Sequence, residues 1–263
     1  MSSRAVTSLA NPTVKAVRAL HLRKERDATG LFVAEGLKAV TEGIETGHAP
    51  AILMHGAEAA GHPLLKRALE ATLLANGETV EVTEAILAKV SRRDNPQAVV
   101  GVFRQVFRPL ETIEPQAARC WVALHRVRDP GNLGTIVRTA DAAGCGGVIL
   151  VGECCDPYSV EAVRATMGSI FAVPLTKASE AEFAAWRNGW PGSVVGALLS
   201  ATVDYRQADY ARPSLLLMGN EQQGLTPDMA ALCDVNVKIP MRGRADSLNL
   251  SVATGIMIYA ATA

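Results

Sequence analysis

The chain has 263 residues, 49% of them hydrophobic and 20% charged, and its 26 basic and 26 acidic side chains give a formal net charge of zero. This composition is typical of a soluble globular protein with one large or two modest domains. No apolar stretch approaches the roughly 18–20 residues of a membrane helix, which excludes a membrane protein, and a nucleic-acid site would require local clustering of basic residues.

The cysteines and histidines form no recognisable disulfide or metal pattern in the sequence. The five cysteines include the adjacent pair Cys154 and Cys155, and an odd count of this kind does not build a disulfide framework. CxxC pairs are absent and the five histidines are scattered, so we expect no metal site. Reduced thiols and a cytoplasmic location are the simplest interpretation.

The N-terminal segment predicts a folded helix. Asn11 and Pro12 supply a cap and a first turn, and Val14, Val17, Leu20 and Leu22 follow near helical spacing. The alternative is an organelle transit peptide, because serine and arginine occur here without an acidic residue before Glu25.

From Gly30 to about Gln105, apolar strand segments alternate with helical segments. The strands are predicted over 30–36, 51–56 and 97–105, and the helices over 62–77 and 83–92. Residues 107–119 then break the periodicity with two prolines and mixed charge, which is typical of a linker.

After the linker the alternation is clearer. Strands are predicted over 120–127, 146–152, 170–176, 193–200, 213–219 and 234–241, and helices over 132–144, 159–169, 180–189, 226–233 and 247–263. The strands are continuous apolar runs between helices, a pattern that predicts a parallel sheet with helices on both faces. Ligands of such sheets bind at the carboxyl ends of the strands.

Polar segments follow three of these strands. In "RDPGNLGTIVRTADAAG", Asn132 can cap the helix and Arg138 lies about a turn and a half into it. In "GNEQQGLTPDM", Glu221 occupies a glycine-flanked turn. In "IPMRGRADSLNLSVATG", Ser247 and Asn249 precede the last helix, and Ser247 can be its N-cap. Taken singly, each segment also fits an ordinary capped helix or a solvated loop, and none is a GxGxxG dinucleotide motif.

Taken in order, the patterns N-x-G-x-x-x-R, G-N-E-x-x-G and I-P-M-x-G-x-x-x-S-L-N-x-S-V-A resemble the SpoU/TrmH family of the SPOUT superfamily, which are S-adenosylmethionine (AdoMet)-dependent RNA ribose 2'-O-methyltransferases. The segment "SLANPTVKAVRALHLRKERDATGLFVAEG" is similar to the substrate-binding domain often fused ahead of them. The resemblance implies a smaller α/β (L30e-like) domain over 1–106, a linker over 107–119, and an α/β catalytic domain over 120–263 whose parallel sheet ends in a trefoil knot.

The resemblance also implies roles for individual residues. Asn132 would lie near the target ribose, Glu221 would hold its loop and Arg138, and Ser247 and Asn249 would bridge nucleotide and cofactor. Arg138 matches the family's proposed base, although a guanidinium accepts protons poorly and is better suited to clamp a phosphate or a developing alkoxide. The implied AdoMet-binding residues are Leu199, Ser200, Met218, Gly219, Ile239, Met241 and Leu248.

The expected partners are RNA, with ribosomal preferred over transfer RNA, and a second copy of the chain packed on the terminal helix. The residues expected to bind RNA are Lys15, Arg18, Arg23, Lys24 and Arg26, with further basic spots at "SRRDN" and "MRGR". The alternatives are a transfer-RNA ribose methyltransferase, a base-methylating SPOUT enzyme, an RNA-binding or assembly factor without turnover, and an unrelated α/β enzyme of small molecules.

Overall fold

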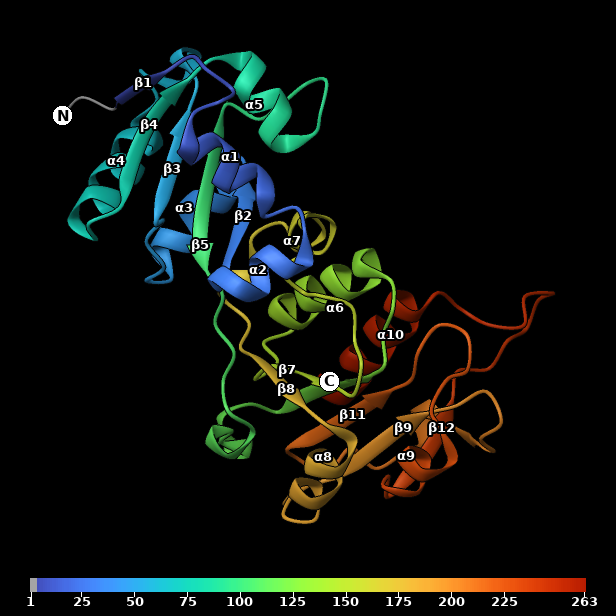
Figure 1. The fold of residues 1–263 in the computed structure, drawn as a ribbon. Coiled ribbons are helices and arrows are strands. Elements are labelled where there is room, and N and C mark those ends of the chain that lie inside the picture. Colours follow the sequence, from blue (N-terminus) through green and yellow to red (C-terminus); the bar gives the residue numbers. More distant parts are fainter. Residues whose placement is uncertain (1–3) are drawn as a thin grey trace. The chain divides into compact units, whose positions relative to one another are not determined.

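The computed structural model describes residues 4–263, which form two compact units (Figure 1). Unit 1 contains the chain up to Gln105 together with Tyr158–Ala172, and unit 2 contains Val106–Pro157 and Val173–Ala263. The segment Tyr158–Ala172 therefore packs with the first unit, although the sequence placed it inside a continuous 120–263 domain.

Unit 1 is a five-stranded mixed sheet with helices. Its strand order is β1 (Arg4–Val6), β4 (Glu78–Val82), β3 (Ile52–His55), β5 (Val99–Arg104), β2 (Leu31–Glu35), and β5 runs antiparallel to both of its neighbours. Its helices are α1 (Pro12–Ala19), α2 (Arg23–Thr29), α3 (Leu37–Glu45), α4 (Pro63–Leu74), α5 (Glu84–Ser91) and α7 (Val160–Thr166).

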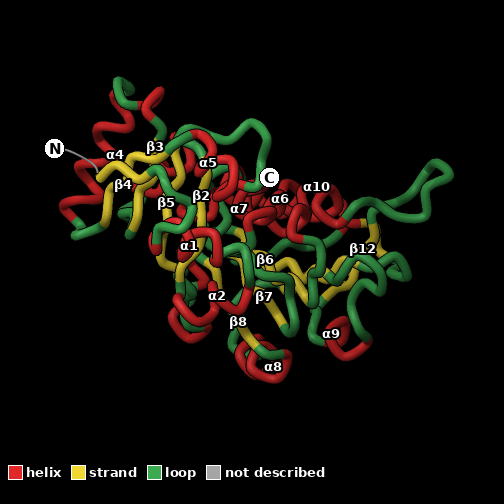
Figure 2. Tube along the Cα trace, turned by 45° about the horizontal axis from the view of Figure 1, so that its top comes forward, coloured by secondary structure: helices red, strands yellow, loops and turns green. Residues whose placement is uncertain are grey.

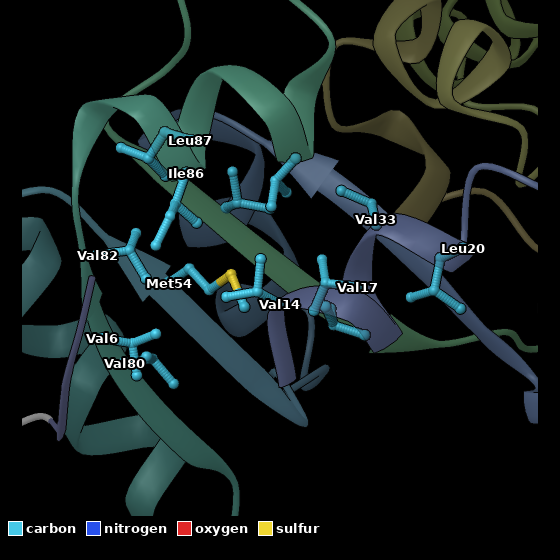
Figure 3. Close-up of a cluster of buried hydrophobic side chains, with 13 residues drawn as sticks. Val6, Val14, Val17, Leu20, Val33, Met54, Val80, Val82, Ile86 and Leu87 are labelled. Atoms are coloured by element: carbon cyan, nitrogen blue, oxygen red, sulfur yellow. The ribbon is translucent and has the colours of Figure 1, made fainter. Parts of the chain in front are cut away.

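The predicted N-terminal helix is confirmed as α1, and it forms part of the unit 1 core. The Asn11 side chain accepts hydrogen bonds from the backbone N–H groups of Thr13 and Val14. Figure 3 shows Val14 and Val17 of α1 packed over the same sheet face as side chains of α5. Residues 12–19 are thus held by burial of one helix face, which is where most helical stability in proteins originates.

Unit 2 contains a seven-stranded sheet in which every pair is parallel, as the sequence predicted. Its order is β10 (Val203–Asp204), β12 (Val235–Lys238), β9 (Val194–Ala197), β11 (Ser214–Met218), β6 (Cys120–His125), β7 (Val148–Val151), β8 (Leu175–Ala178). Within residues 4–263, no helix is long and apolar enough to cross a membrane.

Helices cover both faces of this sheet. The helices α6 (Pro130–Ala142) and α10 (Leu250–Thr262) lie side by side in both views, and α10 also contacts β11 and β6 (Figures 1 and 2). The helices α8 (Glu180–Arg187) and α9 (Pro227–Ala231) cover the other face, where Phe183 and Met229 join a core with Trp121, Ala123 and Leu215.

Several elements differ from the sequence prediction. Strands β1, β4 and β10 and helices α2 and α3 were not predicted. The strand expected over 170–176 is wrong at its start, because Ser169–Phe171 form a 3₁₀ turn and β8 begins only at Leu175. The cause is tertiary: the Phe171 ring packs 4.6 Å from that of Phe103 and 5.7 Å from that of Phe32 in unit 1.

Candidate active site

A cavity of about 360 Å³ opens in unit 2 beside the loops that follow β9, β11 and β12. Its volume lies within the range of small-molecule sites, about 300–1,000 Å³. Every residue that the family resemblance implied for AdoMet lines it: Leu199, Ser200, Met218, Gly219, Ile239, Met241 and Leu248. The position is the one expected for a parallel sheet, at the carboxyl ends of its strands.

The turn after β11 is folded tightly at one wall of the cavity. The Asn220 side chain accepts hydrogen bonds from the backbone N–H groups of Gln222 (3.0 Å) and Gln223 (2.7 Å), and Gly224 N–H donates to the Asn220 carbonyl. A Cβ on Gly219 would lie 2.0 Å from the Gly224 carbonyl carbon, and Gly224 itself has φ +67°. Glycine is therefore required at both ends of "GNEQQG", because the backbone closes on itself there.

Glu221 connects this turn to the start of α6. Its Oε1 accepts hydrogen bonds from Asp129 N–H (3.1 Å) and from Asn132 Nδ2 (3.1 Å), and its Oε2 accepts one from Arg128 N–H (3.2 Å). Asn132 Oδ1 in turn accepts a hydrogen bond from Asn249 Nδ2 (2.9 Å). One chain of hydrogen bonds thus joins residues from all three polar segments.

Two helix caps differ from the sequence prediction. The cap of α6 is Asp129, whose Oδ1 accepts from Asn132 N–H at 2.6 Å, so Asn132 is free to face Glu221 and Asn249. The cap of α10 is Asn249, whose Oδ1 accepts from Ser251 N–H at 2.9 Å, while Ser247 lies outside the helix and lines the cavity. Both corrections move a predicted cap residue into the site.

Arg138 is the catalytic candidate that the structure brings neither to the cavity lining nor to the hydrogen-bond chain of Asn132, Glu221 and Asn249. Its side chain is exposed on α6, and it lies outside the set of described residues that line the cavity. Asn132, Glu221 and Asn249 are joined by hydrogen bonds, and Ser247 lines the same cavity as Glu221. The sequence missed Asn220 as a positioning residue, although an asparagine after a strand and before a polar turn is a recognised turn signal.

Glu221 is an ionised acceptor at neutral pH. Partial burial raises the pKa of its carboxyl group, but the hydrogen bonds from Asn132 and from the Asp129 and Arg128 N–H groups outweigh burial and leave the pKa lowered. A lowered folded-state pKa stabilises the fold above the unfolded pKa, and this contribution disappears as the pH falls through the folded value.

We expect Glu221→Gln to lower methyl transfer by about tenfold or more, because an amide NH₂ would face N–H donors and leave one of them unpaired, at about 1–3 kcal/mol. Initial rates with labelled AdoMet measure the effect, and Glu153→Gln, which changes an exposed carboxylate elsewhere in unit 2, is the matched control. Normal rates in the Glu221→Gln protein would show that the carboxylate is not needed to hold the turn against the start of α6.

The lining of the cavity fits the AdoMet that the family resemblance implied. Its wall combines apolar side chains, Leu199, Met218, Ile239 and Leu248, with the backbone of the turn at Gly219. Apolar walls with a few fixed polar groups are typical of sites for flat cofactors. Among residues 4–263, no group of three or more His, Cys, Asp and Glu side chains could hold a metal ion.

The basic residues predicted to bind RNA are not equivalent in unit 1. Lys15, Arg18, Arg23 and Lys24 are exposed, but Arg26 is only 4% exposed and its Nη1 donates to the Leu20 carbonyl at 2.7 Å. The prediction that Arg26 binds RNA is therefore wrong as a surface contact. Its guanidinium satisfies a carbonyl at the end of α1, and burial of the side chain keeps it from a phosphate.

Comparison with known proteins gives matches along most of the chain. Residues 119–259 match the SpoU rRNA Methylase family, and residues 11–101 match the MRM3-like substrate binding domain. The 23S rRNA (uridine(2479)-2'-O)-methyltransferase of Streptomyces viridochromogenes is 31% identical over 246 residues, covering 91% of this chain and 85% of that protein. The 23S rRNA (guanosine(2553)-2'-O)-methyltransferase RlmP of Bacillus subtilis is 28% identical, covering 97% of each.

A solved structure is more similar still. The AdoMet-bound rRNA methyltransferase from Sinorhizobium meliloti is 48% identical, with a TM-score of 0.93 over 98% of this chain and 97% of that chain. Because the family match spans more than half of the sequence and agrees with the arrangement of the three polar segments, this chain belongs to the SpoU rRNA methylase family.

Proposed function

We propose that this protein transfers a methyl group from AdoMet to a ribose 2'-hydroxyl of ribosomal RNA. The observation that carries the proposal is the cavity whose three loops supply all the residues implied for AdoMet. The names of the Streptomyces and Bacillus relatives, both 23S rRNA 2'-O-methyltransferases, support ribosomal RNA as the substrate and ribose as the acceptor. The AdoMet bound in the Sinorhizobium structure supports the donor.

In this proposal the cavity residues bind the donor, which supplies an electrophilic methyl group. Leu199, Met218, Ile239 and Leu248 enclose the adenosine part, and the backbone around Gly219 and Met241 pairs with its polar edges. Backbone groups are suited to recognise these polar edges, because the tight turn that Gly219 and Gly224 permit fixes their positions.

The hydrogen-bonded side chains orient the acceptor. Asn132 is braced by Glu221 on one side and Asn249 on the other, so its amide is held in one orientation next to Glu221, which lines the cavity. Ser247 contributes a hydroxyl to the cavity wall. Holding the ribose hydroxyl in line with the methyl group is worth about 7–11 kcal/mol in well-oriented reactions, which is enough for most of the rate enhancement.

We further propose that the active form is a homodimer that packs on α6 and α10. These helices expose a shallow apolar groove of about 480 Å³ that includes Val252, Ile256 and Tyr259, with Val252 and Tyr259 each more than half exposed. Since Arg138 lies on α6 outside its own chain's cavity, a dimer on this face offers a way for it to reach the site of the second copy.

Two further features belong to the proposal. The convergence of the loops after β9, β11 and β12 on one cavity supports a trefoil knot in this region, as implied by the family resemblance. A cytoplasmic location is supported by the free state of all five cysteines and by the ribosomal substrates of the relatives.

Calorimetry and labelling together test the proposed function. We expect AdoMet to bind the purified protein. We also expect the labelled methyl group of AdoMet to be transferred to deproteinised 23S rRNA and to block alkaline cleavage at one phosphodiester. The block follows because a 2'-O-methyl ribose cannot attack the neighbouring phosphate. Label in transfer RNA alone would favour the transfer-RNA alternative. Label on a base would indicate a base methyltransferase, and AdoMet binding without label would indicate an assembly factor.

A further inference from the structure

Five basic side chains of unit 1 line one groove between α1 and α5. The groove has a volume of about 700 Å³ and a floor that includes two alanines, and its charged lining consists of Lys15, Arg18, Lys89, Arg92, Arg93 and Asp94. Figure 3 shows that α1 and α5 turn their apolar side chains toward the sheet. The basic side chains therefore occupy the outward faces of both helices.

The cations in this groove are less neutralised than those of α2. Arg23 lies 3.6 Å from Asp27 and Lys24 lies 3.7 Å from Glu25, so both exposed cations of α2 have a carboxylate neighbour. Within residues 4–263, Lys15, Arg18 and Lys89 form no ion pair, and neither does Arg92. The groove thus carries uncompensated charge.

Arg92 holds an unusual backbone conformation at the edge of the groove. It follows α5 with φ 55° and ψ 41°, and its N–H and that of Arg93 both donate to the Ala88 carbonyl. This left-handed position after a helix normally favours glycine, because a Cβ is strained there. The Arg92 side chain at this strained position lines the groove, so its guanidinium lies at the groove's edge.

A buried ion pair fixes the end of α5, and with it the position of Arg92. The Glu35 side chain is 3% exposed and accepts hydrogen bonds from Arg164 Nη2 at 2.7 Å and from Arg164 Nε at 3.2 Å. Arg164 Nη2 also donates to the Ser91 carbonyl at 2.6 Å, and Arg93 Nε lies 3.7 Å from Glu35. The rim of the groove is thereby ordered before any ligand binds, which lowers the entropic cost of binding.

We propose that the groove between α1 and α5 binds the phosphodiester backbone of the RNA substrate, an inference that rests on the proposed function. Five cations against one carboxylate complement a polyanion, and the lining contains no aromatic side chain on which a base could stack. The contacts are therefore to phosphates, which position the RNA on unit 1, while the choice of nucleotide is made elsewhere.

Paired charge removals test this groove with deproteinised 23S rRNA as the probe. Lys89→Gln/Arg92→Gln is expected to raise Kd by roughly tenfold or more and to lower the slope of log Kd against log salt by about 1.4–1.8 for two lost phosphate contacts. The matched control is Lys66→Gln/Arg67→Gln, which removes one lysine and one arginine from the exposed surface of α4 and is expected to change neither quantity.

A single variant separates binding from folding. Arg92→Gly relieves the left-handed backbone while removing the guanidinium, so we expect a Tm no lower than that of the wild type together with weaker RNA binding and a salt slope lower by about 0.7–0.9. The proposal would be overturned if Lys89→Gln/Arg92→Gln and the control Lys66→Gln/Arg67→Gln lost RNA affinity equally. It would also be overturned if both Lys89→Gln/Arg92→Gln and Arg92→Gly bound RNA normally. A larger loss in Arg23→Gln/Lys24→Gln would overturn it too, because that result would place the RNA on α2.

Two readouts distinguish this inference from the proposed function. Filter binding measures RNA affinity without turnover, and AdoMet calorimetry reports on unit 2 alone. If the proposed function holds, the double variant Lys89→Gln/Arg92→Gln is expected to have a higher KM for RNA, with kcat and AdoMet affinity unchanged. Wild-type protein that binds 23S rRNA through the groove without methylating it would refute the methyltransferase proposal and leave the groove in place. Variants that lose affinity for heparin but keep normal affinity for 23S rRNA would refute the groove as an RNA site.

Discussion

Replacing Arg138 with alanine is expected to reduce methyl transfer by at least about 10²–10³-fold, the usual effect of removing one group that stabilises transition-state charge. AdoMet affinity should stay normal, since Arg138 does not line the cavity described in unit 2. A guanidinium remains protonated at neutral pH, so its expected role is to clamp a phosphate or the developing alkoxide rather than to remove the proton. Single-turnover rates with saturating AdoMet measure the chemical step directly.

Two controls sharpen the Arg138 prediction. Arg138→Lys keeps the charge but loses the planar fork, so partial recovery would indicate charge stabilisation, whereas no recovery would indicate a bidentate contact. Mixing Arg138→Ala with Leu248→Trp, a variant that enlarges a side chain lining the cavity, tests the dimer. Hybrids with one intact site are expected to regain activity if Arg138 serves the partner's site. Near-normal turnover by Arg138→Ala would exclude the side chain from the reaction.

Replacing Arg164 with alanine is expected to lower the free energy of unfolding by about 3–5 kcal/mol, because removal of one partner leaves a buried charge uncompensated. The Glu35 side chain is 3% exposed and would retain only Arg93, whose Nε lies 3.7 Å away. The Ser91 carbonyl would also lose its donor from Arg164. Urea unfolding followed by circular dichroism measures the loss.

The double variant Glu35→Leu/Arg164→Met is the control for this ion pair. It removes both charges and fills the space with apolar groups, so it should recover most of the stability lost in Arg164→Ala. A loss below about 1 kcal/mol in Arg164→Ala, as is usual for exposed pairs, would show that the burial of Glu35 is not maintained in solution.

The sequence by itself determined the parallel sheet of unit 2 and the three loops of its site. Strands such as β6 and β11 are uninterrupted apolar runs, and an apolar run between helices has few alternatives to a buried parallel strand. The tight turn at Gly219–Gly224 could be predicted for a similar local reason, since the glycines and Asn220 specify its backbone within a few residues.

The tertiary structure alone decided how these local pieces meet. No local pattern indicates that Asn132, rather than capping α6, lies between Glu221 and Asn249, residues more than 80 positions away in sequence. The same holds for Arg26. Its charge predicts an exposed side chain, but the guanidinium is buried and donates a hydrogen bond to the Leu20 carbonyl. Hydrogen bonds and burial between distant segments depend on the packing of whole elements, and that packing is set by summed contacts that no single stretch of sequence contains.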